Sequence, residues 1–196
     1  MIFICLPVSF AIDYPFAIKA FLAISGFGYV IYVLLKIEGN KLKMAPNLRW
    51  RSFWKHVFIK LLIIAFLTIV YMWFVAKPDL FHVLFREPQL WVIILFLYAL
   101  FSVYPQELIF RTFYFQRYQM LFKSRSLFIF LNATLFSLAH IFYRNPLVML
   151  ITFLGGILFA LTYDKTKSTV LVSIEHAIYG CWLFTVGMGN ILGFPG

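Results

Sequence analysis

Six long apolar runs, separated by short and mostly basic loops, most limit how this chain can fold. Hydrophobic residues make up 63% of the sequence and charged residues only 12%, whereas soluble domains carry roughly 25% charged residues. Inside a bilayer the backbone finds no water, so the favoured spanning structure is a helix that satisfies its own hydrogen bonds. We therefore predict an all-α, polytopic transmembrane helical bundle with spans at 16–35, 57–76, 90–116, 127–142, 147–163 and 168–187.

Residues 1–12 (MIFICLPVSFAI) form a further apolar stretch ahead of the first predicted span. No basic segment precedes them, which argues against a secretory signal peptide. We expect these residues to be either the remnant of another span or a re-entrant lead-in to the bundle.

The net charge of +10 is explained by topology rather than by a nucleic-acid partner. Lys and Arg gather in the loops 36–55, 117–126 and 164–167, whereas the loops 77–89 and 143–146 are nearly balanced or carry one basic residue. Cytoplasmic loops of membrane proteins are enriched in Lys and Arg. We predict that the three basic loops are cytoplasmic, that the lipid bilayer is the main partner, and that no nucleic acid is bound.

Two acidic residues, Glu107 and Glu175, fall within predicted spans. An ionised side chain at mid-bilayer costs roughly 2.5–3.5 kcal/mol on insertion scales, so such residues usually face the bundle interior and mark a site. Arg111 follows Glu107 by four residues, a spacing that places both on one helix face as an ion pair. Lys60 lies nearer a span end, where its ammonium is expected to snorkel.

Two histidines, His140 and His176, also lie within predicted spans. At about 1.5 Å of rise per residue, Glu107, His140 and His176 lie roughly 12–20 Å from the cytoplasmic ends of their helices. Three helices thus carry ionisable groups to a similar depth. A carboxylate can act as a general base and an imidazole can donate a proton or support an oxyanion. Alternatively, these three residues could hold a divalent metal such as zinc; either arrangement favours hydrolysis.

Three short segments together resemble a known family. The segment 105–111 (PQELIFR) resembles the EExxxR motif of the CAAX prenyl protease and bacteriocin-processing (CPBP, or Abi) intramembrane proteases. Phe136 and His140 match that family's FxxxH motif, and His176 matches the histidine of its third motif, HxxxN or HxxxD. The motifs occur in family order on separate predicted helices.

The resemblance implies a membrane-embedded endopeptidase, a hydrolase that cuts a membrane-associated protein or peptide. In that family the first glutamate of EExxxR activates water with help from the two histidines. The second glutamate and the arginine, here Glu107 and Arg111, form a supporting pair. The asparagine of the third motif supports the oxyanion.

Two positions depart from the family pattern. Gln106 stands where the first glutamate is expected, and an amide cannot serve as a general base. Gly180 stands where the third motif has asparagine or aspartate. Either Glu107 takes over the base work, or Glu175 compensates beside His176, or the chain is a catalytically inactive relative with an immunity, regulatory or partner-binding role.

The resemblance covers roughly residues 90–187, which we take as a CPBP-like core. Residues 1–89 would then supply about two N-terminal spans with the apolar lead-in, and residues 188–196 a C-terminal tail. A bacterial cytoplasmic membrane is the location that the resemblance suggests. A small transporter with a buried proton relay also fits the intramembrane acids, although it does not explain the ordered motifs.

Two further features predict local packing. Pro105 removes a backbone hydrogen bond and is expected to distort the third span beside Glu107. Gly155, Gly156 and Ala160 form a face of small residues, which lets neighbouring helices approach closely.

Overall fold

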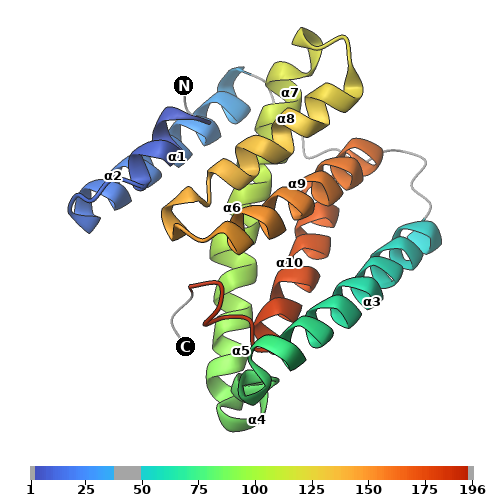
Figure 1. The fold of residues 1–196 in the computed structure, drawn as a ribbon. Helices are drawn as coiled ribbons and strands as arrows, with labels where there is room; N and C mark the ends of the chain where they lie inside the picture. Colours follow the sequence, from blue (N-terminus) through green and yellow to red (C-terminus); the bar gives the residue numbers. More distant parts are fainter. Residues whose placement is uncertain (1–2, 38–49, 194–196) are drawn as a thin grey trace.

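The computed structural model of the protein describes residues 3–37 and 50–193, and this part of the chain is helical without any strand (Figure 1). Most of the predicted cytoplasmic loop 36–55 lies outside the described residues. The predicted all-α bundle is thus confirmed. Its α-helices are α1 (Cys5–Phe10), α2 (Phe16–Tyr32), α3 (Trp50–Val75), α4 (His82–Arg86), α5 (Pro88–Leu97), α6 (Tyr104–Glu107), α7 (Tyr114–Tyr118), α8 (Arg125–Leu138), α9 (Pro146–Thr166) and α10 (Thr169–Thr185).

Five helical segments among the described residues are long and apolar enough to cross a membrane. They are Ala17–Lys36, Trp50–Val75, Pro88–Leu121, Arg125–Tyr143 and Pro146–Thr166. The sixth predicted span, 168–187, is the shorter apolar helix α10, which packs against α3, α5 and α9. The lead-in forms the six-residue helix α1, which is too short to span, because a spanning helix needs about 20 residues.

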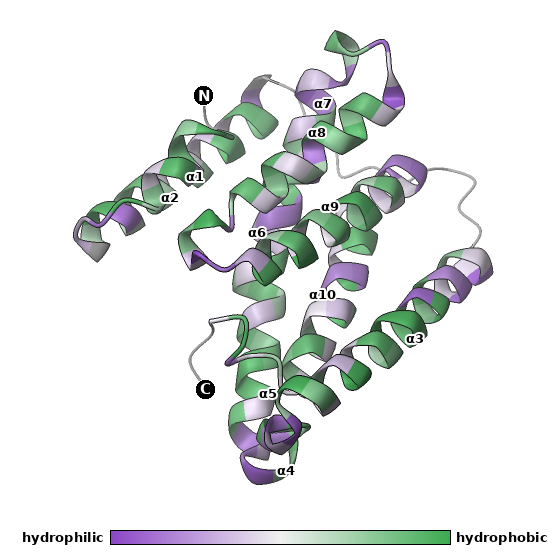
Figure 2. Ribbon diagram, viewed as in Figure 1, coloured by the Kyte–Doolittle hydropathy of each residue, from purple (hydrophilic) through white to green (hydrophobic). Residues whose placement is uncertain are grey.

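Large apolar side chains cover the outside of the bundle, as expected for a protein whose solvent is lipid. Phe66 and Phe74 on α3 are 68% and 82% exposed. Hydrophobic residues extend along most helices, while hydrophilic residues gather at helix ends, in loops and part-way along α10 (Figure 2). The exposed apolar surface and the apolar helices together make this an integral membrane protein.

The third span is irregular around Pro105. It runs without a break from Pro88 to Leu121, but residues Tyr98–Val103 and Leu108–Phe113 are π-helical. Pro105 lies in α6, the short α-helical segment between these stretches, and has no N–H to donate to the carbonyl four residues earlier, so one α-helical hydrogen bond is missing here. Wider π-helical turns often occur at functional sites, and here they flank Glu107.

The last three helices begin at residues suited to cap them. Ser124, Asn145 and Ser168 each precede a helix, and their side-chain oxygens accept hydrogen bonds from backbone N–H groups of the first turn of α8, α9 and α10. Pro146 occupies the first position of α9, where no intrahelical N–H is needed. These short polar residues therefore fix where α8, which precedes His140, α9, and α10, which carries His176, begin.

Helices α8 and α9 form the most extensive contact in the described bundle. At their crossing, a Cβ built on Gly156 would lie 2.9 Å from the Cα and 3.1 Å from the Cβ of Ala133. Ala133 is fully buried. The predicted face of small residues therefore permits this close approach, which brings the end of α8 beside α9 and α10.

We expect Gly156→Ala to destabilise the protein by about 1–3 kcal/mol, because the added methyl meets the backbone of α8 rather than a movable side chain. Gly28→Ala is the matched control, since nothing lies within 4 Å of a Cβ at that helical position. Thermal unfolding in lipid nanodiscs would compare the two variants. Equal stability of the two would contradict the close α8–α9 contact.

Candidate active site

A buried ion pair lies at the centre of the third span. The Oε2 atom of Glu107 is 3.1 Å from Nε of Arg111, within ion-pair distance although not aligned as a hydrogen bond. Both side chains are 0% exposed. The i, i+4 pair predicted from the sequence is therefore present, and each charge compensates the other away from water.

Arg111 also connects the third span to α8. Its Nη1 donates to Oδ1 of Asn132 over 2.7 Å, and Nδ2 of Asn132 donates to the carbonyl of Phe110 over 2.7 Å. The guanidinium lies over the ring of Phe136, with its central carbon 4.8 Å from the ring centroid. These contacts hold the arginine and fix α8 relative to the third span.

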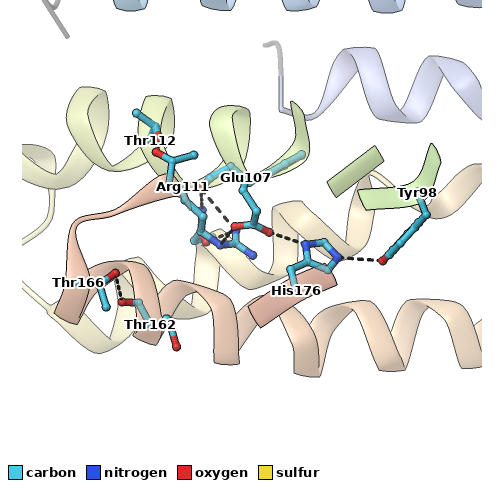
Figure 3. A network of polar contacts seen from close by, with 10 residues as sticks. Tyr98, Glu107, Arg111, Thr112, Thr162, Thr166 and His176 are labelled. Atoms are coloured by element: carbon cyan, nitrogen blue, oxygen red, sulfur yellow. Dashed lines mark hydrogen bonds and ion pairs between the residues drawn. The ribbon is translucent and has the colours of Figure 1, made fainter. Parts of the chain in front are cut away.

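His176 extends the same network to Tyr98 (Figure 3). Its Nδ1 is 2.8 Å from Oε1 of Glu107, and its Nε2 is 3.2 Å from the hydroxyl of Tyr98. A carboxylate beside Arg111 only accepts hydrogen bonds, so Nδ1 must carry the proton. In the neutral imidazole Nε2 then has the lone pair, and the Tyr98 hydroxyl donates to it. Phe159 stacks on the imidazole with ring centroids 4.2 Å apart.

His140 lies two residues beyond the end of α8 and is held by the last turn of that helix. Its Nδ1 is 2.8 Å from the carbonyl of Phe136. Since a carbonyl only accepts, Nδ1 donates and Nε2 has the lone pair. No residue in the described ranges bonds to that Nε2. Phe136 contacts both imidazoles, with its ring centroid 5.0 Å from His140 and 5.7 Å from His176.

A cavity of about 300 Å³ brings these groups together. Part of its wall is formed by both histidines, by Tyr98 and by the two positions that depart from the family pattern, Gln106 and Gly180. Apolar side chains complete the wall, among them Ile64 and Leu67 of α3 and Leu183 of α10. Glu107 does not line this cavity and contacts it only through His176. The structure therefore brings together His140, His176 and Gln106, with Glu107 behind them.

Gln106 faces the cavity with an unused acceptor. Its Nε2 donates to the hydroxyl of Ser102 over 2.9 Å, while its Oε1 is buried without a partner in the described part of the chain. A buried acceptor left unpaired costs about 1–3 kcal/mol.

Glu175 has a separate partner. Its Oε1 forms an ion pair with Lys60 of α3 and accepts a hydrogen bond of 2.9 Å from the hydroxyl of Tyr179. Lys60 thus reaches across to α10. The sequence instead predicts that its ammonium snorkels towards the membrane surface. Glu175 is 0% exposed and is absent from the cavity wall, although it adjoins His176 in sequence. About 100° of helix rotation separates neighbouring side chains, so the two point to different surroundings.

The residues that could bind a metal are not arranged as a ligand set. Across residues 3–37 and 50–193, no group of three or more His, Cys, Asp and Glu side chains is placed to hold an ion. Glu107 is engaged by Arg111 and His176, and Nε2 of His176 is engaged by Tyr98. Zinc binding by His140, His176 and Glu107 therefore does not fit this arrangement, and the mechanism proposed below uses no metal.

The comparison with protein families gives one match. Residues 88–182 match the model described as "Type II CAAX prenyl endopeptidase Rce1-like". This part of the chain, 95 of the 196 residues, is similar to that family. The Rce1-like segment begins with the third span and contains all three motifs noted in the sequence. Neither the comparison with curated proteins nor that with solved structures found a match.

Sequence reasoning missed three residues of the Rce1-like site and its surroundings. Asn132 carried a usable signal, because it is a polar residue inside a predicted span, as Glu107 is. Lys60 also carried one, since a charge in a span invites a search for its partner. Tyr98 carried none, because tyrosine is ordinary in an apolar helix, and its proximity to His176 depends on how the spans pack.

We expect Lys60→Met to destabilise the protein by about 2–3 kcal/mol, because it leaves a fully buried carboxylate without its cation. This loss lies at or below the lower end of the roughly 3–5 kcal/mol seen when a fully buried ion pair loses one partner. The reason is that the Lys60 side chain is itself 26% exposed. The double variant Lys60→Met/Glu175→Leu should recover most of the loss. Lys55→Met, at an exposed position on the same helix, is the control. If the stability losses of Lys60→Met and Glu175→Leu simply add in a thermal double-mutant cycle, the Lys60–Glu175 ion pair is contradicted.

Proposed function

We propose that this protein is an intramembrane endopeptidase in which His140 activates the attacking water. The observation that carries the proposal is the lone pair on Nε2 of His140, which is unpaired among the described residues and belongs to a side chain lining the cavity. Similarity of residues 88–182 to a family described as endopeptidases supports the reaction class. The proposal retains the expected hydrolysis but moves the base work from Glu107 to His140.

The proposed reaction is a direct water attack on a peptide carbonyl. Nε2 of His140 takes a proton from water as the water oxygen bonds to the carbonyl carbon. The carbonyl π electrons move to oxygen, which gives a tetrahedral oxyanion. When the C–N bond breaks, the imidazolium returns its proton to the leaving nitrogen, so His140 ends neutral. A well-placed general base contributes typically 10²–10⁴-fold to the rate.

Glu107 and Arg111 act as positioning residues in this proposal. The carboxylate holds His176 through Nδ1 and is neutralised by Arg111, so neither oxygen is free to take a proton from water. Gln106 lines the cavity but lacks a basic group, so it cannot take a proton from water. In this proposal Glu107 and Arg111 therefore position His176, and neither takes part in proton transfer.

The cavity also suggests the chemistry of the substrate. No Asp, Glu, Lys or Arg of the described residues lines its wall, and most of its lining is aliphatic or aromatic. An uncharged, apolar stretch of a membrane-associated protein fits this environment, whereas an acidic or basic segment would lose its hydration. A bacterial cytoplasmic membrane remains the proposed location.

A second candidate function is favoured by one observation. Gln106 faces the cavity at the position where the family motif has its first glutamate, and an amide cannot take a proton from water. An inactive relative that binds a membrane peptide without cutting it would have this arrangement.

The deciding experiment compares protein termini in cells that carry the wild-type chain, His140→Gln or His56→Gln at matched expression. We expect termini that depend on His140 and persist in His56→Gln, whose substitution lies at an exposed position outside the cavity. Loss of the base should lower cleavage by about 10²–10⁴-fold. Peptide mass spectrometry of the membrane fraction would identify the cut sites.

A parallel Gln106→Glu variant separates the two candidate functions. If the wild type and His140→Gln give identical termini, while Gln106→Glu alone gives new ones, the natural chain is an inactive relative whose missing group is the carboxylate. If the wild type, His140→Gln and Gln106→Glu all give the same termini, the endopeptidase proposal is wrong.

A further inference from the structure

Tyr98 occupies the space that a side chain at position 180 would need. A Cβ built on Gly180 would lie 2.1 Å from the hydroxyl oxygen of Tyr98 and 2.4 and 2.5 Å from two of its ring carbons. No side chain fits at position 180 while Tyr98 keeps this rotamer. Gly180 and Tyr98 therefore form a matched pair, because the Tyr98 side chain occupies the space that a side chain at position 180 would take.

The Tyr98 hydroxyl enters the cavity as a hydrogen-bond donor. Tyr98 lines the cavity, its oxygen is 3.2 Å from Nε2 of His176, and its ring packs edge-on against Phe184 with centroids 5.1 Å apart. The close-up shows the hydroxyl at the end of the chain that runs from Arg111 through Glu107 and His176 (Figure 3). Because Nδ1 of His176 carries the imidazole proton, the O–H must point at Nε2.

The Tyr98 hydroxyl can change its hydrogen-bond acceptor without moving the phenol ring. Rotation about the C–O bond moves the hydrogen while the ring stays packed against Phe184. The phenol ring is fixed by the third span, which is π-helical from Tyr98 to Val103. The position of the phenol oxygen is thus preorganised, and only the hydroxyl hydrogen has to turn when the oxyanion forms.

We propose that Tyr98 donates the hydrogen bond that stabilises the oxyanion, from the third span instead of from α10. This inference rests on the proposed endopeptidase function. As water attacks, negative charge builds on the former carbonyl oxygen, and the Tyr98 O–H turns from Nε2 of His176 to that oxygen. No proton is transferred by Tyr98, because the proton from water goes to His140. The hydroxyl thereby takes the place of a polar side chain at position 180.

A purely structural role for Tyr98 makes a different prediction. If the ring only fills the space above Gly180, Tyr98→Phe keeps the packing and should leave turnover unchanged. If the hydroxyl is an oxyanion donor, the same variant lowers kcat while KM stays nearly constant, because the lost bond exists only in the transition state.

The test uses purified protein in nanodiscs and a peptide spanning a cut site identified in cells. We expect Tyr98→Phe to lower kcat by about 10²–10³-fold, the usual effect of removing one oxyanion donor, with KM within about twofold. Tyr104→Phe is the matched control, since Tyr104 lies on the same span, is 37% exposed and does not line the cavity. Unchanged kcat in Tyr98→Phe would overturn the inference.

A swapped pair provides a second test if Tyr98→Phe fails to fold. Gly180→Asn alone should clash with Tyr98 and lose activity, whereas Tyr98→Ala/Gly180→Asn makes room for an amide donor on α10. We expect the double variant to be at least about tenfold more active than Gly180→Asn alone. If a folded double variant shows no such gain, the idea of exchanged donors is wrong.

The outcomes separate this inference from the proposed function. Cleavage by both the wild type and Tyr98→Phe at equal rates rejects the Tyr98 donor and leaves the endopeptidase intact. If only Gln106→Glu cleaves, the natural chain is not an endopeptidase, and Tyr98→Phe is then measured in that background. Absence of cleavage in every background rejects both.

Discussion

The buried pair of Glu107 and Arg111 is the constraint on which the rest of the core depends. Two opposite charges with no exposed surface are tolerated in a membrane interior only if they stay together, and removing one partner of such a pair costs about 3–5 kcal/mol. Their remaining contacts then determine the geometry around them. Arg111 holds Asn132 of α8, and Glu107 holds His176 of α10. One ion pair thereby positions three helices.

The same pair determines which proton positions are available for chemistry. Because Glu107 remains an acceptor, His176 donates from Nδ1 and receives the Tyr98 hydroxyl at Nε2. His140 reaches the same tautomer independently, through the backbone carbonyl of Phe136. The two imidazoles therefore present their lone pairs differently: one is capped by Tyr98, and the other has no bonded partner among the described residues. This difference assigns the base role to His140 in the proposed reaction.

The sequence predicted the helical bundle, the Glu107–Arg111 pair and the depth shared by His140 and His176, because each depends on spacing within one helix. It did not predict which side chains of different helices would contact one another. Lys60 was expected to snorkel, since a lysine near a span end can do so, but Glu175 on another helix provides a stronger partner. Gly180 looked like a simple loss, because the sequence does not reveal that Tyr98, 82 residues earlier, fills its space. Rotation about the helix axis, which turns Gln106 to the cavity and Glu107 away, likewise depends on tertiary packing.

The central claim is that His140 presents an uncapped Nε2 lone pair to the cavity while His176 is held by Glu107. Imidazole ¹⁵N chemical shifts of histidine-labelled protein in nanodiscs test this directly. The chain has four histidines, and single His→Gln variants would assign their signals. We predict the Nδ1–H tautomer for both His140 and His176, with Glu107→Gln shifting only the His176 signals strongly. An Nε2–H tautomer for His140 would contradict the account, because that nitrogen could then no longer take a proton from water.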